Sequence, residues 1–277
     1  MFRKTVSLLM IATLVLFSSL ALAESDKKSY TFGVVPQFDA RRIHSIWQPI
    51  LDELQQRTGL KFSLQGASSI PVFEQEFAKG DFDFAYMNPY HILVANQKQG
   101  YVPLVRDIAR KLYGIVVVRK DSPVHKVEDL NNKQVAFPAP NALGASLLPR
   151  SAFINTFHID IKPKYVRTHT SVYLNVVMGE VAAGGGVQKT LSQQRPEVRD
   201  ALRVLYETPR VSPHPVSVHS RVDKKIRLQV KQAFLDMGLA EEGKTLLAKI
   251  PMKKIGSAEM DDYTPLAKLD LESIYQE

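Results

Sequence analysis

The sequence predicts an exported α/β protein of two lobes, each built on a mixed, mostly parallel sheet flanked by helices. Three observations support this prediction: an export signal at residues 1–23, strand and helix patterns that alternate afterwards, and two extended segments near 113–120 and 204–218. Such alternation is typical of sheets with helices on both faces. The two extended segments indicate a hinge that the chain crosses twice. We expect residues 24–115 and 209–277 in lobe 1 and residues 116–208 in lobe 2.

The first 23 residues have the pattern of a cleaved secretory signal. Arg3 and Lys4 precede an apolar run from Val6 to Leu22, and a small-residue A-x-A site ends at Ala23. This run is short for a membrane span and ends in small residues, so we expect cleavage after Ala23.

Composition excludes several classes of function. The chain has no cysteine, which rules out disulfides, thiolate metal sites and a cysteine nucleophile. The formal net charge of +8 is compatible with small anionic ligands, but the cationic residues are scattered, so nucleic acid is not an expected partner. The histidines show no metal-binding spacing, and no nucleophile motif or carboxylate pair is present. We therefore expect no enzyme activity, no catalytic residue, no metal and no cofactor.

The first half of the chain alternates strand and helix patterns. Strands are predicted at 30–35, 60–64 and 81–86, and helices at 43–58, from 68 through 77, and from 89 to about 97. The first helix repeats apolar residues from Ile43 to Leu54 at helical spacing and ends at Gly59. Residues 68–71 (SSIP) cap the second helix, and Gly80 closes it. Ligands of such sheets lie at the carboxyl ends of the strands, where the connecting loops meet.

The second half repeats this alternation and then becomes helical. Strands are predicted at 113–119, 135–137, 164–168, 181–187, 203–208 and 216–219, with helices from 142, around 171–178, and through the remainder of the chain. In the last part, Ile226, Val230, Phe234 and Met237 share one helix face.

Residues 134–149 (QVAFPAPNALGASLLP) form the most informative stretch. We interpret it as a buried strand, a proline-containing turn and a helix that Asn141 caps. The free N–H groups and the dipole of a helix start suit an anionic ligand. An ordinary strand–helix junction that binds nothing is the alternative.

Several segments in this order resemble one known family of exported binding proteins. They are the opening GVVPQ, the Gly80–Tyr86 turn, Arg119–Pro123, the 134–149 stretch, Thr168–His169, Gly179–Val181 and Glu207–Pro209. Together they resemble the periplasmic solute-binding proteins of phosphate, phosphite and phosphonate ABC transporters, which have the type II periplasmic binding protein fold. The resemblance covers nearly the whole chain after the signal.

The resemblance implies a periplasmic protein that holds an oxyanion between its lobes. It implies ligand contacts from Tyr86, from the helix start at Asn141 and from His169. Ala142 and Leu143 stand where the family has hydroxyl residues, Ala182 replaces an acidic residue, and Ile70 replaces an aromatic one. Hydroxyl donors help a neutral pocket to bind a tetrahedral oxyanion. These differences predict an altered pocket, and a ligand other than a phosphonate is one expectation.

The candidate ligand-binding residues lie at the predicted loops and helix starts of both lobes. They are Gln37, Ser69, Tyr86, Asn88, Asn141, Ala142, Leu143, Thr168, His169, Thr170, Gly185 and Arg210. The run Gly184–Gly186 indicates close approach of the backbone to a ligand or to the other lobe. Phe38, Tyr90 and Tyr173 are candidates to close over the ligand, with an ordinary core position as the alternative.

We predict a monomeric solute-binding protein that captures a small anion and closes about its hinge. Its expected partner in the inner membrane is an ABC transporter permease. A signalling role beside a sensor histidine kinase is the alternative, because both roles use the same fold. An exported hydrolase is a third hypothesis from a different class.

Overall fold

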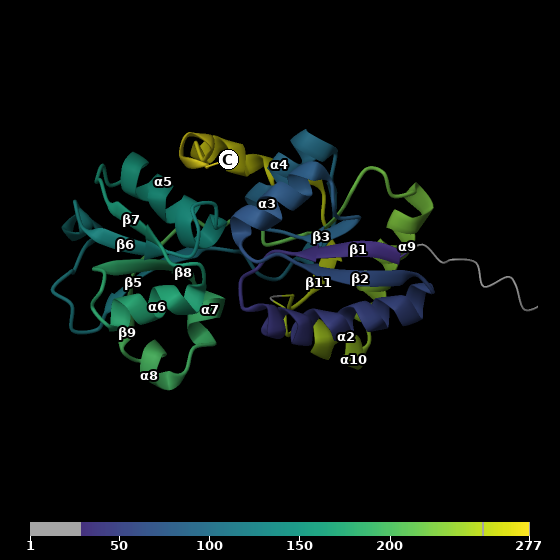
Figure 1. Ribbon diagram of the computed structural model, residues 1–277, viewed down its shortest axis with the longest axis horizontal. Coiled ribbons are helices and arrows are strands. Elements are labelled where there is room, and N and C mark those ends of the chain that lie inside the picture. The colour runs from purple at the N-terminus through teal and green to yellow at the C-terminus, as the bar shows by residue number, and fades with distance from the viewer. Residues whose placement is uncertain (1–28, 251, 277) are drawn as a thin grey trace, which may run out of the picture.

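The computed structural model describes residues 29–250 and 252–276 and has two lobes, each with its own sheet (Figure 1). The predicted signal peptide lies outside the described residues. No helix within the described part of the chain has the length and apolar character needed to cross a membrane.

The first lobe contains a six-stranded sheet in the order β11-β4-β10-β3-β1-β2. Its strands are β1 (Ser29–Val34), β2 (Lys61–Gly66), β3 (Phe84–Tyr86), β4 (Val102–Asp107), β10 (Val216–Val218) and β11 (Ile255–Ser257). Strand β1 pairs in parallel with β2 and β3, whereas β10 and β11 pair antiparallel with their neighbours. Strand β4 was not predicted, because the sequence VPLVRD contains a proline and shows no regular alternation.

The helices of the first lobe cover both faces of this sheet. They are α2 (Ala40–Thr58), α3 (Ile70–Lys79), α4 (Pro89–Gln99), α9 (Lys224–Met237) and α10 (Glu241–Leu247). Ser69 caps α3 and Gly80 ends it in a left-handed conformation, which confirms both predicted helix signals. Helix α2 begins before the predicted Ile43, because Asp39 accepts from the Arg42 N–H and serves as its N-cap.

The second lobe contains a five-stranded sheet in the order β7-β6-β8-β5-β9. Its strands are β5 (Gly114–Arg119), β6 (Gln134–Phe137), β7 (Lys162–Tyr165), β8 (Ala183–Val187) and β9 (Leu202–Glu207). Strand β6 pairs in parallel with β7 and β8, whereas β5 pairs antiparallel with β8 and β9. Both sheets are mixed, as predicted. They are less parallel than expected, because β5 and β10, which follow the two crossings between lobes, enter their sheets in the opposite direction, as does the edge strand β11.

The helical segments of the second lobe include one widened turn. They are η1 (Val127–Leu130), the π-helix η2 (Leu143–Leu147), α5 (Leu148–Asn155), α6 (His169–Val177), α7 (Gln188–Ser192) and α8 (Pro196–Arg199). Pro149 accounts for the π-helical turn, because proline has no N–H and its ring crowds the carbonyl four residues earlier, that of Ala145.

The glycines of β5 and β8 let η2 pack directly on the sheet. A Cβ atom on Gly114 would lie 1.9 Å from the carbonyl oxygen of Gly144, and one on Gly185 would lie 1.9 Å from that of Ala145. On the other face of the sheet, Gly184 and Gly186 contact side chains of α6. The close approach predicted for this glycine run is therefore made to helices of the same lobe, and not to a ligand or to the other lobe.

The chain crosses between the lobes at residues 108–113 and 208–215, and an antiparallel bridge between Leu112 and Val211 joins the two crossings. The extended segment near 113–120, which was predicted as one part of the hinge, follows the first crossing in the chain and is not the crossing. Residues 114–119 form β5, a mostly buried strand within the second sheet.

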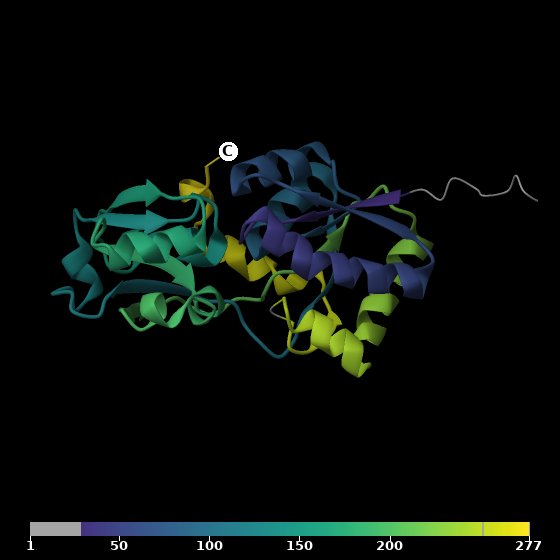
Figure 2. The same ribbon diagram turned by 60° about the horizontal axis from the view of Figure 1, so that its bottom comes forward.

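The sequence predicted that the last part of the chain is helical throughout, and this prediction is wrong. It contains β11 and three 3₁₀ turns, η3 (Met260–Asp262), η4 (Thr264–Leu269) and η5 (Glu272–Ile274). Leu266 and Leu271 share an apolar cluster with Leu147 and Leu148 of the second lobe. The C-terminal segment therefore returns from the first lobe to the second and packs against both (Figures 1 and 2).

Candidate ligand-binding site

A small cavity of about 20 Å³ lies where the two lobes meet. Residues of both lobes and His214 of the second crossing line it: Val35, Gln37, Ile70, Asn88, Ala142, Leu143, Gly144, Ala145, His169, Val187 and His214. Most of these residues follow the carboxyl ends of β1, β3, β6 and β8, as the sheet topology predicts.

The beginning of η2 forms one wall of this cavity. Ala142 precedes the helix with an extended backbone and provides no capping side chain. The N–H groups of Leu143, Gly144 and Ala145 belong to the first turn, where the helix itself offers them no carbonyl acceptor. Because these three residues line the cavity, the backbone supplies several donors and the positive end of a helix dipole to its interior.

His169 is held in the second lobe by a buried hydroxyl pair. Its Nδ1 lies 3.3 Å from Oγ1 of Thr190, and that oxygen lies 2.7 Å from the hydroxyl of Tyr173. Burial lowers the pKa of His169 to about 4. The ring is therefore neutral at neutral pH, and because Thr190 engages Nδ1, Nε2 is the nitrogen that can face a ligand.

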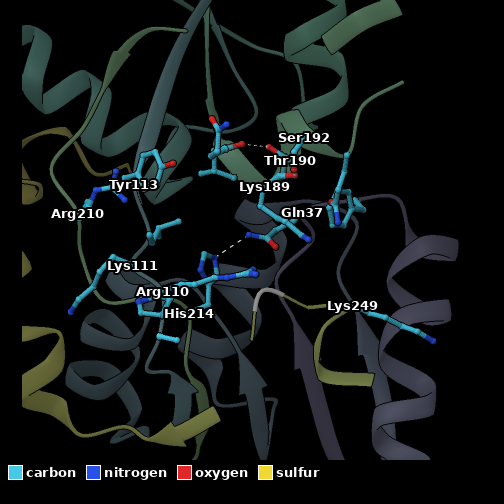
Figure 3. A pocket seen from close by; sticks show the side chains of 17 residues that line it. Gln37, Arg110, Lys111, Tyr113, Lys189, Thr190, Ser192, Arg210, His214 and Lys249 are labelled. Atoms are coloured by element: carbon cyan, nitrogen blue, oxygen red, sulfur yellow. Dashed lines mark hydrogen bonds between the residues drawn. The ribbon is translucent and has the colours of Figure 1, made fainter. Parts of the chain in front are cut away.

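His214 contributes a second neutral imidazole from the second crossing. The amide Nε2 of Gln37 donates to its Nε2 over 3.1 Å, an arrangement that assigns the ring proton to Nδ1 (Figure 3). The ring stacks on Tyr86, with centroids 5.3 Å apart. Burial, together with repulsion from His91 and His169, lowers the pKa of His214 to about 3.

Asn88 lies at the beginning of α4 and joins the lobes. Its Oδ1 accepts the N–H groups of Tyr90 and His91, each over 2.8 Å, and therefore caps the helix. Its Nδ2 donates to the carbonyl oxygen of Asn141 in the second lobe over 3.2 Å.

The predicted capping role of Asn141 is wrong. Its Nδ2 donates to Oε2 of Glu74 over 3.0 Å, and its Oδ1 accepts the N–H of Gln276 over 3.0 Å. The side chain therefore turns toward the first lobe and the C-terminal segment. It lines a different cavity, beside Glu74 and Gln276, and leaves the start of η2 to backbone groups alone.

The hydroxyl residues and the glycine among the candidates lie outside the small cavity. Ser69 caps α3, and Thr168 caps α6 by accepting the N–H of Ser171 over 3.1 Å. Thr170 is exposed on the first turn of α6. Gly185 is buried beneath Ala145 and beside the ring of Phe137.

The aromatic candidates are placed in the core or in the wider cleft. Tyr86 is 2% exposed and lies behind His214, against Trp47. Tyr173 is buried beneath Thr190, and Tyr90 packs against Tyr275 of the C-terminal segment. Phe38 is the one aromatic candidate of the four that lines a large cavity, described next.

A cavity of about 610 Å³ adjoins the small one and shares Gln37, Val187 and His214 with it. Arg210 lines this larger cavity, where its guanidinium lies 4.3 Å from the ring centroid of Tyr113 and 3.5 Å from Glu207. Residues 109–113 of the first crossing and 187–190 of the second lobe form its other walls.

Sequence reasoning missed His214, Thr190 and Lys189. His214 was grouped with the scattered histidines, although its position between Pro213 and Pro215 in a crossing segment could have marked it. Thr190 and Lys189 have no local signal, because they reach the site only through the packing of α7 against α6. Among the described residues, no group of three histidine, aspartate or glutamate side chains could hold a metal ion.

Comparisons with known proteins identify the family of the chain. A family model described as the periplasmic substrate-binding protein of a phosphonate ABC transporter matches residues 32–263. The phosphonates-binding periplasmic protein of Escherichia coli (strain K12) is 21% identical over 265 residues, which cover 91% of this chain and 78% of that protein.

Two solved structures share the fold. A binding protein component of an ABC phosphonate transporter from Pseudomonas aeruginosa is 18% identical with a TM-score of 0.80, over 88% of this chain and 86% of that one. PhnD1 of Prochlorococcus marinus (MIT 9301), in complex with methylphosphonate, is 15% identical with a TM-score of 0.80, over 90% of this chain and 99% of that one. With a family match over most of its length and this two-lobed fold, the chain belongs to the family of periplasmic substrate-binding proteins of phosphonate ABC transporters.

Proposed function

We propose that this protein binds a small phosphonate or related oxyanion between its lobes and presents it to an ABC transporter permease in the inner membrane. The observation that carries the proposal is the start of η2, whose first-turn residues line a cavity between the lobes together with His169 and His214. Membership of the family supports the transport role and the periplasmic location. Removal of residues 1–23 by cleavage is part of the proposal.

Backbone and imidazole donors replace the missing hydroxyls in this proposal. Three N–H groups of Leu143, Gly144 and Ala145 offer donors to the oxygens of a tetrahedral head group, and the helix dipole favours its charge. In this proposal Thr190 donates to Nδ1 of His169, so that Nε2 carries the ring proton and adds one donor without the desolvation cost of a buried cation. The absence of the expected hydroxyls at Ala142 and Leu143 therefore does not remove the anion-binding character of this helix start.

Closure of the lobes would complete the site. Asn88, Gln37 and Ile70 come from the first lobe, whereas the helix start and His169 come from the second. We place the hinge, and with it the lobe boundaries, at the two crossing segments, 108–113 and 208–215. The boundary expected at 115/116 would divide β5, whereas the one expected at 208/209 lies within the second crossing. A ligand that contacts both lobes stabilises the closed form by its differential affinity for that form.

The function is tested by isothermal titration calorimetry of residues 24–277 with methylphosphonate, phosphite and phosphate, and with acetate as a carboxylate comparison. We expect a 1:1 complex with at least one phosphorus oxyanion. His169→Leu is expected to weaken it about tenfold or more through the loss of one donor to a charged group. Thr170→Ala, an exposed neighbour on the same turn, is the matched control and leaves binding unchanged. Absence of binding to all three phosphorus oxyanions would refute the proposal.

The two other hypotheses receive no support from a specific observation. The matched family is a transport component, which favours the permease over a histidine kinase as partner. The small cavity contains no carboxylate and no serine or threonine, so a hydrolase mechanism has no nucleophile or carboxylate base among the residues that line it.

A further inference from the structure

The larger cavity of the cleft has a one-sided charge. Five cationic residues are among those that line it: Arg110, Lys111, Lys189, Arg210 and Lys249. No aspartate or glutamate is among its lining residues. A concave surface with one sign of charge concentrates ions of the opposite sign, because field lines are focused in a cleft.

Most of this charge is not neutralised within the protein. Arg210 lies 3.5 Å from Glu207 in an exposed pair, which leaves its guanidinium accessible. In the described part of the chain, Arg110, Lys189 and Lys249 form no ion pair. Lys189 is half-buried on α7 and reaches from the second lobe toward Gln37, whereas Lys249 turns away from the cavity (Figure 3).

The basic cavity is continuous with the proposed head-group site. Gln37, Val187 and His214 line both cavities, so a ligand whose head group lies at the start of η2 can extend past these residues into the larger space. The small cavity has room for a head group only, at about 20 Å³, whereas the larger one offers about 610 Å³. A substituent on a ligand bound at the start of η2 would therefore extend into the larger cavity.

We propose that the basic cavity is a second anion subsite, so that the preferred ligand is a phosphonate or phosphate ester with a second negatively charged group. This inference rests on the proposed function and adds the chemical class of the substituent. Lys189 and Arg110 are the specificity-determining residues. A cationic aminoalkyl substituent is disfavoured, because cationic residues and no carboxylate line the cavity.

Three ligands with the same two-carbon linker separate charge from size: 3-phosphonopropionate, n-propylphosphonate and 2-aminoethylphosphonate. Their terminal groups are anionic, neutral and cationic. Calorimetry of residues 24–277 is expected to give at least about fivefold tighter binding for the carboxylate than for the neutral ligand, and weaker binding for the amine. Raising the ionic strength from about 0.01 M to about 1 M should reduce these ratios, because salt screens charges at the open side of the cleft.

Lys189→Met keeps the length of the side chain and removes its charge. It should reduce the preference for the carboxylate at least about threefold while binding of n-propylphosphonate stays the same. Lys133→Met, at an exposed position just before β6 and outside both cavities, is the charge-matched control and should change neither value. Arg110→Gln is a second variant with the same expected direction.

The possible results distinguish the two proposals. Equal affinity for all three ligands, unaltered by Lys189→Met and Arg110→Gln, would overturn the second subsite and leave the phosphonate site intact. Tightest binding of the amine would also overturn it. Absence of binding to all three ligands and to methylphosphonate would contradict the proposed function itself, and the second subsite with it.

Discussion

Asn88 and Asn141 join the two lobes through one hydrogen bond, in which Nδ2 of Asn88 donates to the carbonyl oxygen of Asn141 over 3.2 Å. The same Asn88 caps α4 through Oδ1, and the side chain of Asn141 reaches Glu74 and the C-terminal segment. Opposite this contact, Arg42 donates to Gln193 over 3.2 Å. The lobes are therefore in polar contact at two places beside the cleft.

Asn88→Asp should favour the open form. The carboxylate keeps the cap but loses the donor to Asn141, a loss of about 0.5–1.5 kcal/mol, or up to about tenfold in the ratio of closed to open protein. Small-angle X-ray scattering without ligand should report a larger radius of gyration. Asn155→Asp makes the same chemical change at an exposed helix position and should leave the radius unchanged. An unchanged radius in Asn88→Asp would contradict the role of this contact in closure.

Gly185→Ala should destabilise the second lobe. The new Cβ atom would lie 1.9 Å from the carbonyl oxygen of Ala145 and 2.7 Å from the ring of Phe137, so η2 has to move off the sheet. We expect a loss of about 1–3 kcal/mol in the free energy of unfolding, measured in urea. Gly66→Ala has no neighbouring atom within 4 Å and should change stability little. Equal stability of the two variants would show that η2 adapts without cost.

Thr190→Val should weaken phosphonate binding through His169. The isosteric change removes the hydroxyl that engages Nδ1 of His169 and contacts the hydroxyl of Tyr173. The imidazole then loses its fixed orientation, and we expect about threefold to tenfold weaker binding by calorimetry. Thr190→Ser keeps the hydroxyl and should restore affinity. The positioning role would be wrong if serine and valine had equal effects.

Stability should fall as the pH is lowered from neutrality. The pKa values of His169 and His214, about 4 and about 3, lie below the ordinary value of 6.5 for histidine. At a pH between these values and 6.5, both histidines are therefore protonated in the unfolded chain and neutral in the folded protein. Their contribution is fully present above a pH of about 6.5 and is lost progressively toward these folded-state values. Melting temperatures between about pH 7.5 and about pH 5 should show this slope.

His169→Gln and His214→Gln should each flatten the slope, because each removes one group whose protonation opposes folding. His44→Gln, at an exposed position of α2, is the matched control and should leave the slope unchanged. A slope that is identical in all four proteins would assign the pH dependence to other groups.

Local signals predicted most of the elements correctly. Ser69 and Gly80 bound α3 as expected, because a capping side chain and a left-handed glycine act on the turn in which they stand. The same logic failed at Asn141. There the side chain found stronger partners in Glu74 and Gln276, residues that are distant in sequence and that no local pattern could indicate.

By itself, the sequence determined the export pattern, the alternation of strands and helices, the family resemblance and the helix start that faces the cleft. These follow from composition, periodicity and capping, which depend on neighbours along the chain. Only the tertiary structure decided which groups meet there. It placed His214 beside Gln37 and turned Asn141 away, and it brought Lys189 and Arg110 to one basic cavity. The reason is that burial and long-range hydrogen bonds between the lobes, rather than local propensity, fix where these side chains point.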